Sequence, residues 1–409
     1  MQFCRFLREK RTVPSLKGGF PLKYWRGYLT AGIFAAIAWA LQQLGQKYSQ
    51  LVDMIYPYVT RSVQGFLTAW TSAVDFNVWQ LVVVTAAVIA VAALVLTIIF
   101  KRSVIQWFGW VLAVISMTVC LNTAIYGLNY YAGPISDDLR LEMREYSQAD
   151  LEQAAAFYRD KANELAVQMP RSETGEAQFS DFETLAEQTG NGFRHLVLDR
   201  YFSIYGGDYI PVKQLGWSDM YTSMGITGFT CFLTGEAAVN PQIPPVSLPF
   251  TMAHEMSHRL CVAREDEANF SAFIACEANE SLEYRYSAYF MAYRYCLNAL
   301  AKTDSAAAAA IAEGCTGELK WDLDAYNRFY QENQKPEATK VGNKVNDTYL
   351  KASGDSDGIA SYGAVCDYLV NWYLLEYTTP EEEEVKFDPF DETQVDLSGL
   401  VNAKPAGEE

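Results

Sequence analysis

The sequence predicts a membrane-anchored α+β protein, in which three N-terminal transmembrane helices precede a mostly α-helical outer domain with a small β-sheet. Three observations lead to this fold class. The first third of the chain holds three long apolar stretches, two of them without a charged residue. Most of the remaining chain has the residue spacing of helices. One stretch within it is rich in glycine, tyrosine and threonine, a composition typical of short strands and turns.

Composition narrows the classes of function. The chain has 409 residues, a net charge of -17 and a mean hydropathy of -0.05. This length is enough for two or three domains. The negative charge argues against a nucleic-acid partner, because phosphate binding needs a basic surface. Half of the residues are hydrophobic, which excludes a chain that is disordered throughout.

The three apolar stretches cover residues 25–44, 78–100 and 104–125, and Arg26 is the only charged residue in them. A helix that rises 1.5 Å per residue needs about 20 apolar residues to cross a bilayer core, and each stretch is long enough. We therefore expect a transmembrane region over residues 25–127. Buried helices of a soluble core are the alternative, and Gln42 and Gln43 make this alternative strongest for the first stretch.

Basic residues orient these helices. Residues 1–24 carry six basic residues against one acidic residue, and Lys101 and Arg102 follow the second stretch. Because basic segments stay in the cytoplasm, we expect a cytoplasmic N-terminus, with the chain after residue 127 outside the cytoplasmic membrane. A cleaved signal peptide is disfavoured, since no small-residue cleavage site follows the first stretch.

The loop between the first two spans predicts an amphipathic helix. Within residues 46–77, apolar residues such as Leu51, Ile55 and Val59 recur at helical spacing. Such a helix would lie along the outer membrane interface or pack under the outer domain, with a kink at Pro57.

The outer domain is expected over residues 128–377. Its predicted elements are helices over 147–168 and 180–200, a strand over 228–234, and helices with breaks from 250 to 377. Residues 378–409 are acidic and aperiodic, which predicts a disordered tail. Cys296 and Cys315 flank a predicted helix turn and are candidates for a disulfide in an oxidising compartment.

The chemistry is concentrated in a stretch that reads His-Glu-Met-Ser-His, from His254 to His258. Positions four apart on a helix share a face, so the two imidazoles can converge on one ion. Zinc binds imidazole nitrogen, and catalytic zinc sites combine three protein ligands with water. Glu255 is placed to take a proton from that water and pass it to a leaving amine. With only 3 histidines in the chain, chance seldom produces this spacing.

The third ligand is expected from the acidic segment that begins at Glu265. Glu265 lies seven positions after His258, which leaves enough chain for a tight turn that brings a second helix back over the first. Glu265 and Glu267 are both candidates, and either would complete a thermolysin-type set of two histidines and one glutamate. The alternative is an ordinary helix N-terminus, where acidic residues are favoured.

Two resemblances extend this interpretation. Residues 265–269 resemble the E-x-E-A-D pattern of membrane-embedded zinc peptidases, which implies that Glu265 binds zinc and that Asn269, in place of the usual Asp, supports the ligands. The chain also resembles a bacterial family of uncharacterised membrane proteins with three N-terminal spans and an outer HExxH zincin-like domain of the gluzincin type. The matching stretches are YGLNY (126–130), GITGF (225–229), TGEAAVN (234–240), LPFTMAHEMSH (248–258), AREDEANF (263–270), NDTYLK (346–351) and SYG (361–363). This family usually has Gly, which suits a turn with positive φ, where this chain has Cys261.

Other residues are weaker candidates. Tyr362 is a candidate proton donor to the oxyanion, although a structural role is the stronger alternative in a chain with 26 tyrosines. The strand before the motif could pair with an extended peptide or be purely structural. Glu236 and Asn240 would line the cleft or close a turn, and His195 is expected to be an ordinary helix residue.

These patterns predict a membrane-anchored, zinc-dependent metallopeptidase, a hydrolase that acts outside the cytoplasmic membrane. Zn2+ is the expected cofactor. A peptide or protein substrate, including one from the cell envelope, and the lipid bilayer are the expected partners. Two other functions stay open: a non-catalytic zincin-like domain that binds peptides or envelope components as a sensor or scaffold, and an amidase that acts on peptidoglycan peptides.

Overall fold

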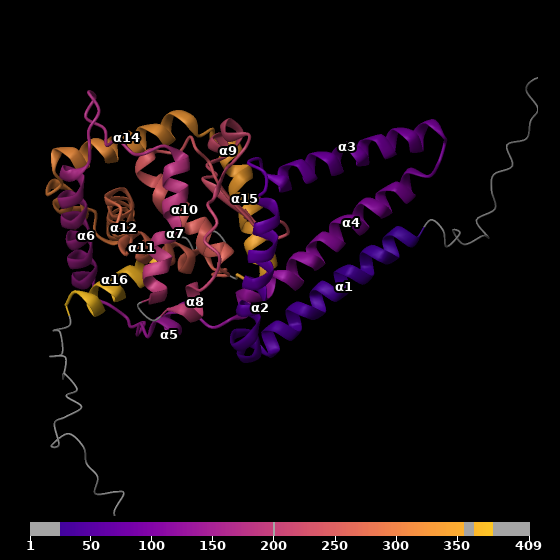
Figure 1. Cartoon of the computed structure of the whole chain (residues 1–409), viewed down its shortest axis with the longest axis horizontal. Coiled ribbons are helices and arrows are strands. Elements are labelled where there is room, and N and C mark those ends of the chain that lie inside the picture. The colour runs from indigo at the N-terminus through magenta and orange to yellow at the C-terminus, as the bar shows by residue number, and fades with distance from the viewer. Residues whose placement is uncertain (1–24, 199–200, 356–363, 379–409) are drawn as a thin grey trace, which may run out of the picture.

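The computed structural model describes residues 25–198, 201–355 and 364–378. Three long helices project together from one side of a helical domain (Figure 1). We call them the arm: α1 (Arg26–Lys47), α3 (Val78–Ile99) and α4 (Val104–Ile125). The predicted basic segment 1–24 and almost all of the predicted acidic tail lie outside the described residues.

Two of the arm helices, α3 and α4, are long and apolar enough to cross a membrane. Helix α1 has the same length as α3 but is less apolar, because glycines, alanines and glutamines take up much of it. The described chain therefore has two membrane-length apolar helices where the sequence analysis predicted three. Helix α1 packs along α4. A Cβ on Gly27 would lie 2.4 Å from the carbonyl carbon of Gly109, so glycine lets these two backbones approach closely.

Helix α2 (Ser49–Thr71) lies between the arm and the domain (Figure 1). Its polar face is buried: the Gln64 amide donates to the Phe232 carbonyl at 3.0 Å, and the Thr68 hydroxyl donates to the Gly235 carbonyl at 2.6 Å. Its apolar face is exposed. The predicted amphipathic helix is confirmed, and it uses its polar side to pack against the domain.

The domain is built mainly of helices around α12 (Leu282–Thr303), which contacts α6 (Gln148–Gln168), α11 (Glu265–Glu277) and α16 (Val365–Glu376). Helix α6 begins with a capping box, in which the Asp150 carboxylate accepts from the Ser147 backbone amide at 2.8 Å. The remaining helical elements are η2 (Gly127–Tyr131), α5 (Ile135–Leu139), α7 (Phe182–Leu198), α8 (Phe202–Tyr205), α9 (Ser218–Met224), η3 (Pro245–Ser247), α10 (Leu248–Arg259), α13 (Ser305–Glu313), α14 (Gly317–Asn333) and α15 (Pro336–Ser353).

A three-stranded sheet interrupts the helices, as predicted. Its order is β1 (Lys213–Gln214), β3 (Glu236–Val239), β2 (Gly228–Cys231). Strand β3 is buried in the middle, parallel to β1 and antiparallel to β2. Within the described chain, β2 is therefore an edge strand, and it packs against α10.

One buried carboxylate joins this sheet to the arm. Glu236 accepts from the backbone amides of Val78 and Trp79, at 2.8 and 2.9 Å, and from the Lys213 ammonium at 2.8 Å. It thus satisfies backbone donors that the first turn of α3 leaves without helical partners. Glu236, expected to line a cleft or close a turn, instead attaches an apolar arm helix to the sheet.

The described cysteines form no disulfide. Cys315 lies 3.2 Å from the Tyr293 hydroxyl, whereas the Cys296 sulfur lies 3.9 Å from that of Cys366. The predicted pairing of Cys296 with Cys315 is therefore wrong, because the turn between their helices directs the two thiols to different neighbours.

Candidate metal centre

Helix α10 positions the two histidines. All of its residues are buried, because β3, α7, α11 and α12 surround it. His254 and His258 lie one turn apart on one face, and their Nε2 atoms are 3.1 Å apart. Two ring nitrogens this close cannot both carry a hydrogen toward each other, so the pair is suited to sharing a cation.

The turn after α10 brings a carboxylate to this pair. Cys261 has a left-handed backbone with φ 76, at the position where the resembling family has Gly. The turn reverses the chain, and α11 begins at Glu265. The Oε2 atom of Glu265 lies 3.3 Å from Nε2 of His254 and 3.4 Å from Nε2 of His258. These three residues form the one buried His/Cys/Asp/Glu group that could hold a metal ion in the described chain.

The spacing of these atoms fits a tetrahedral ion. Atoms about 2.0–2.1 Å from a tetrahedral zinc ion lie about 3.3 Å from one another, and the distances here are 3.1, 3.3 and 3.4 Å. The Glu265 Oε2 and His254 Nδ1 atoms are buried without a hydrogen-bond partner in the described chain. An unsatisfied buried carboxylate oxygen is costly, and a cation between the three side chains would satisfy it.

Hydrogen bonds and neighbouring charges set the tautomer of His258 and the pKa values of His258 and Glu265. Nδ1 of His258 lies 2.8 Å from the Val262 carbonyl, which favours the tautomer that leaves Nε2 free to bind a metal. Burial lowers the pKa of His258, but the Glu265 carboxylate outweighs burial and raises this pKa to about 9. For Glu265, burial raises the pKa, but His258 and His254 outweigh it and hold the pKa well below its usual range. The ionised Glu265 carboxylate therefore attracts a cation, and a bound metal ion would displace the proton that His258 carries at neutral pH.

Glu255 lies buried between α10 and the edge strand. Its Oε2 accepts from the Thr230 hydroxyl of β2 at 2.7 Å, and burial raises its pKa. Gly228, on the same strand, lies so close that a Cβ there would be 2.3 Å from Oε1 of Glu255. Neither Thr230 nor Gly228 was predicted from the sequence as a partner of Glu255. A glycine inside a strand is a signal of close approach, and it could have pointed to Gly228.

Glu267 faces a different environment from Glu265. Its Oε1 accepts from the backbone amide of Ile135 and from the Tyr368 hydroxyl, each at 3.3 Å. Burial raises its pKa to about 8. The structure brings Glu265 to the histidines and directs Glu267 toward α5 and α16.

The remaining predicted site residues are not part of the three-residue metal group. Asn269 is buried one turn after Glu265, where its carbonyl oxygen accepts from the Tyr295 hydroxyl at 3.3 Å and its amide nitrogen has no partner in the described chain. Asn240 is buried and donates to Thr222 at 2.8 Å. Tyr362 lies outside the described residues.

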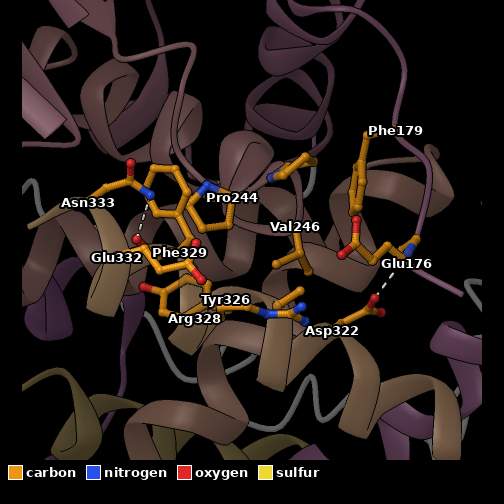
Figure 2. Close-up of a pocket in the computed structure, with 13 residues that line it drawn as sticks. Glu176, Phe179, Pro244, Val246, Asp322, Tyr326, Arg328, Phe329, Glu332 and Asn333 are labelled. Atoms are coloured by element: carbon orange, nitrogen blue, oxygen red, sulfur yellow. Dashed lines mark hydrogen bonds between the residues drawn. The ribbon is translucent and has the colours of Figure 1, made fainter. Parts of the chain in front are cut away.

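One cavity in the described chain lies away from the metal centre. It measures about 340 Å³ and lies between the segment before α10 and helix α14, as Figure 2 shows with Pro244, Val246, Tyr326 and Phe329. Its buried acid, Asp322, is 2.8 Å from the Arg171 guanidinium. None of the metal-centre residues lines this cavity.

Comparison with known proteins supplies a family. A family model described as "Protein of unknown function (DUF3810)" matches residues 51–370, which include α2, the sheet and both ligand-bearing helices. No curated protein and no solved structure matches the chain. The expected membership of a family without an assigned function is confirmed, whereas the zincin-like activity stays a prediction. The chain belongs to the DUF3810 family of proteins of unknown function.

Proposed function

We propose that this protein is a membrane-anchored zinc metallopeptidase that hydrolyses peptide bonds outside the cytoplasmic membrane. The observation that carries the proposal is the tetrahedral spacing of three buried ligand atoms, from His254, His258 and Glu265. These residues would hold the ion. Bound zinc polarises a carbonyl oxygen and lowers the pKa of a water molecule to about 7.

Glu255, which directly follows His254 on α10, is our candidate for the general base. Thr230 occupies its Oε2, so Oε1 is the oxygen that accepts a proton from the attacking water and later passes it to the leaving amine. Burial raises the pKa of Glu255, which makes it a stronger base than an exposed glutamate. The missing side chain at Gly228 leaves room for this oxygen.

The edge strand offers a place for the substrate. Strand β2 pairs with β3 on one side only in the described chain. An extended peptide can add to such an edge through main-chain hydrogen bonds. Because Thr230 of β2 contacts Glu255, a peptide on this edge would lie next to the base.

In the membrane topology that we propose, α1, α3 and α4 each cross the membrane. Helix α1 is as long as the apolar helices α3 and α4 and packs along α4, so it would cross with them. Basic residues before α1 and at Lys101 and Arg102 would be cytoplasmic. The domain with the metal centre would then lie outside, in a bacterial cytoplasmic membrane.

Glu255→Gln tests the activity. We expect purified wild type to cleave a mixed peptide library, and the variant to lose at least about 100-fold in rate while keeping its zinc, since glutamine cannot accept the proton. Mass spectrometry of products and metal analysis measure both. Zinc bound by a wild type that cleaves nothing would favour a non-catalytic peptide- or envelope-binding domain. Products from peptidoglycan peptides alone would favour an amidase.

A further inference from the structure

Helix α2 lies across the outer ends of the arm helices. It follows α1 after a single residue, Tyr48, and ends six residues before α3 begins. Its middle touches the end of α4, where the Tyr56 hydroxyl donates to the Ala124 carbonyl at 2.9 Å. A helix that meets the same ends of all three arm helices runs along the membrane surface when α3 and α4 cross the membrane.

The two faces of α2 differ in composition, and the composition of each face indicates what covers it. Thr60, Gln64 and Thr68 are buried against the domain. The opposite face is apolar and exposed over almost the whole helix, and it consists of Leu51, Met54, Ile55, Tyr58, Val59, Phe66 and Trp70. Most of α3 and α4 is likewise apolar and exposed, and only residues 72–77 separate α2 from α3, so we assign the bilayer as the occupant of this face.

The turn next to the metal centre packs against α2. The turn that follows His258 lies on the polar face: the Cys261 sulfur is 3.3 Å from the Thr60 hydroxyl, and Arg61 donates to the Leu260 carbonyl at 3.2 Å. About one helix diameter, roughly 10–12 Å, then separates this turn from the apolar face. An extended chain rises about 3.3 Å per residue, so three to four residues span this distance, and about five residues, roughly 16 Å, allow for the further rise from the turn to the ligands.

The end of α4 contacts the same turn. Tyr126 directly follows α4, and its hydroxyl donates at 3.3 Å to the Val262 carbonyl, which also lies 2.8 Å from Nδ1 of His258. The Tyr126 ring stacks on Phe232, whose ring is 6.5 Å from that of His258. The edge strand has a similar link to α3, because the Phe229 ring lies 5.1 Å from the Trp79 ring.

We infer that the centre acts on peptide segments within about five residues of the outer membrane surface, and that its substrates are themselves anchored in the bilayer. This inference rests on the proposed peptidase function. A peptide that leaves the bilayer would meet β2 beside the first turn of α3 and the metal ligands above α2. A bond far from the membrane would have to be brought back to this level before it could be cut.

Tethered reporters test the inference. Full-length protein is reconstituted in phosphatidylethanolamine–phosphatidylglycerol vesicles with reporters that carry a transmembrane helix, a spacer, ten randomised residues and a fluorescent protein. The spacer is either five flexible residues or a 40-residue alanine-rich helix of about 60 Å. We expect the short-spacer reporter to be cut at least tenfold faster. Equal rates, or equal cutting of a soluble library at the same concentration, would overturn the inference but keep the peptidase. No cutting of any reporter by zinc-loaded protein would overturn the peptidase and the inference with it.

A second experiment measures the contact with lipid without using activity. Photoactivatable lipids should label the exposed face of α2, from Leu51 to Trp70, and Phe66→Asp should reduce this labelling at least threefold while zinc content stays unchanged. Val167→Asp is the matched control, because Val167 is similarly exposed, 60% against 63%, but lies on α6 at the far side of the domain (Figure 1). Equal labelling of α2 and α6 would contradict the placement of the centre at the membrane.

Discussion

Gly228 lies so close to Glu255 that no side chain fits between them. A Cβ there would approach three atoms of the Glu255 side chain, the nearest at 2.3 Å. We expect Gly228→Ala to displace the carboxylate and to lower kcat for peptide cleavage at least about tenfold, with zinc content unchanged. Gly317→Ala is the control, because no atom lies within 4 Å of the added carbon. An unchanged kcat in Gly228→Ala would show that the position of Glu255 is not critical.

Cys261 holds a left-handed backbone that glycine would adopt without strain. Cys261→Gly and Cys261→Ala both remove the thiol that contacts Thr60, but only glycine relieves the backbone. We expect the glycine variant to have a free energy of unfolding about 1 kcal/mol higher than that of the alanine variant. Denaturant unfolding of the detergent-solubilised variants measures the difference. Equal stabilities would mean that this turn carries no strain.

Single residues also show the limit of prediction from sequence. The His-Glu-x-x-His spacing was sufficient to place His254, Glu255 and His258 together, because helical geometry alone fixes their relation. It could not choose between Glu265 and Glu267. These two side chains differ by about 200° around their helix, and the one that meets the histidines depends on the turn at Cys261. Tertiary contacts with Ile135 and Tyr368 then hold Glu267 away.

At the scale of elements, the attachment of α3 to the sheet depends on a buried ion pair. Glu236 lies between the Lys213 ammonium and the first amides of α3. Glu236→Gln leaves Lys213 without a charged partner, and we expect a loss of about 3 kcal/mol in the free energy of unfolding. Hydrogen exchange should also become faster at Val78 and Trp79.

The matched control for this pair is Glu337→Gln. Its partner, Lys340, is 2.8 Å away, but both side chains are largely exposed. The stability should change by less than about 0.5 kcal/mol. If Glu236→Gln is equally mild, the carboxylate does not hold α3 to the sheet.

Helices and strands were predicted best where a single local sequence pattern determines them. The α6 capping box, the strand-rich stretch and the apolar runs of α3 and α4 all follow from local sequence. Helix α1 was predicted as a helix, but its Gly- and Ala-rich composition serves close packing on α4 and lowers its apolarity. The sequence left two arrangements open for α2, since its choice of partner depends on backbone carbonyls at Phe232 and Gly235.

At the scale of the whole molecule, the mostly helical fold with a small sheet and apolar helices was predictable from residue patterns. The contacts between the arm and the domain were not predictable, because they connect residues far apart in the chain. Examples are Glu236 with Val78 and Tyr126 with Val262. These contacts bring the candidate metal centre to the ends of the arm helices that adjoin the domain. The position that we propose for the centre relative to the membrane therefore depends on how the whole chain is assembled.

Metal analysis of the purified full-length protein tests the metal centre most directly. We predict about one zinc ion per chain in wild type and in Glu267→Ala, and far less in Glu265→Ala, because only Glu265 shares the tetrahedral spacing with His254 and His258. A wild type without stoichiometric zinc, or a loss of metal in Glu267→Ala alone, would contradict the site described here.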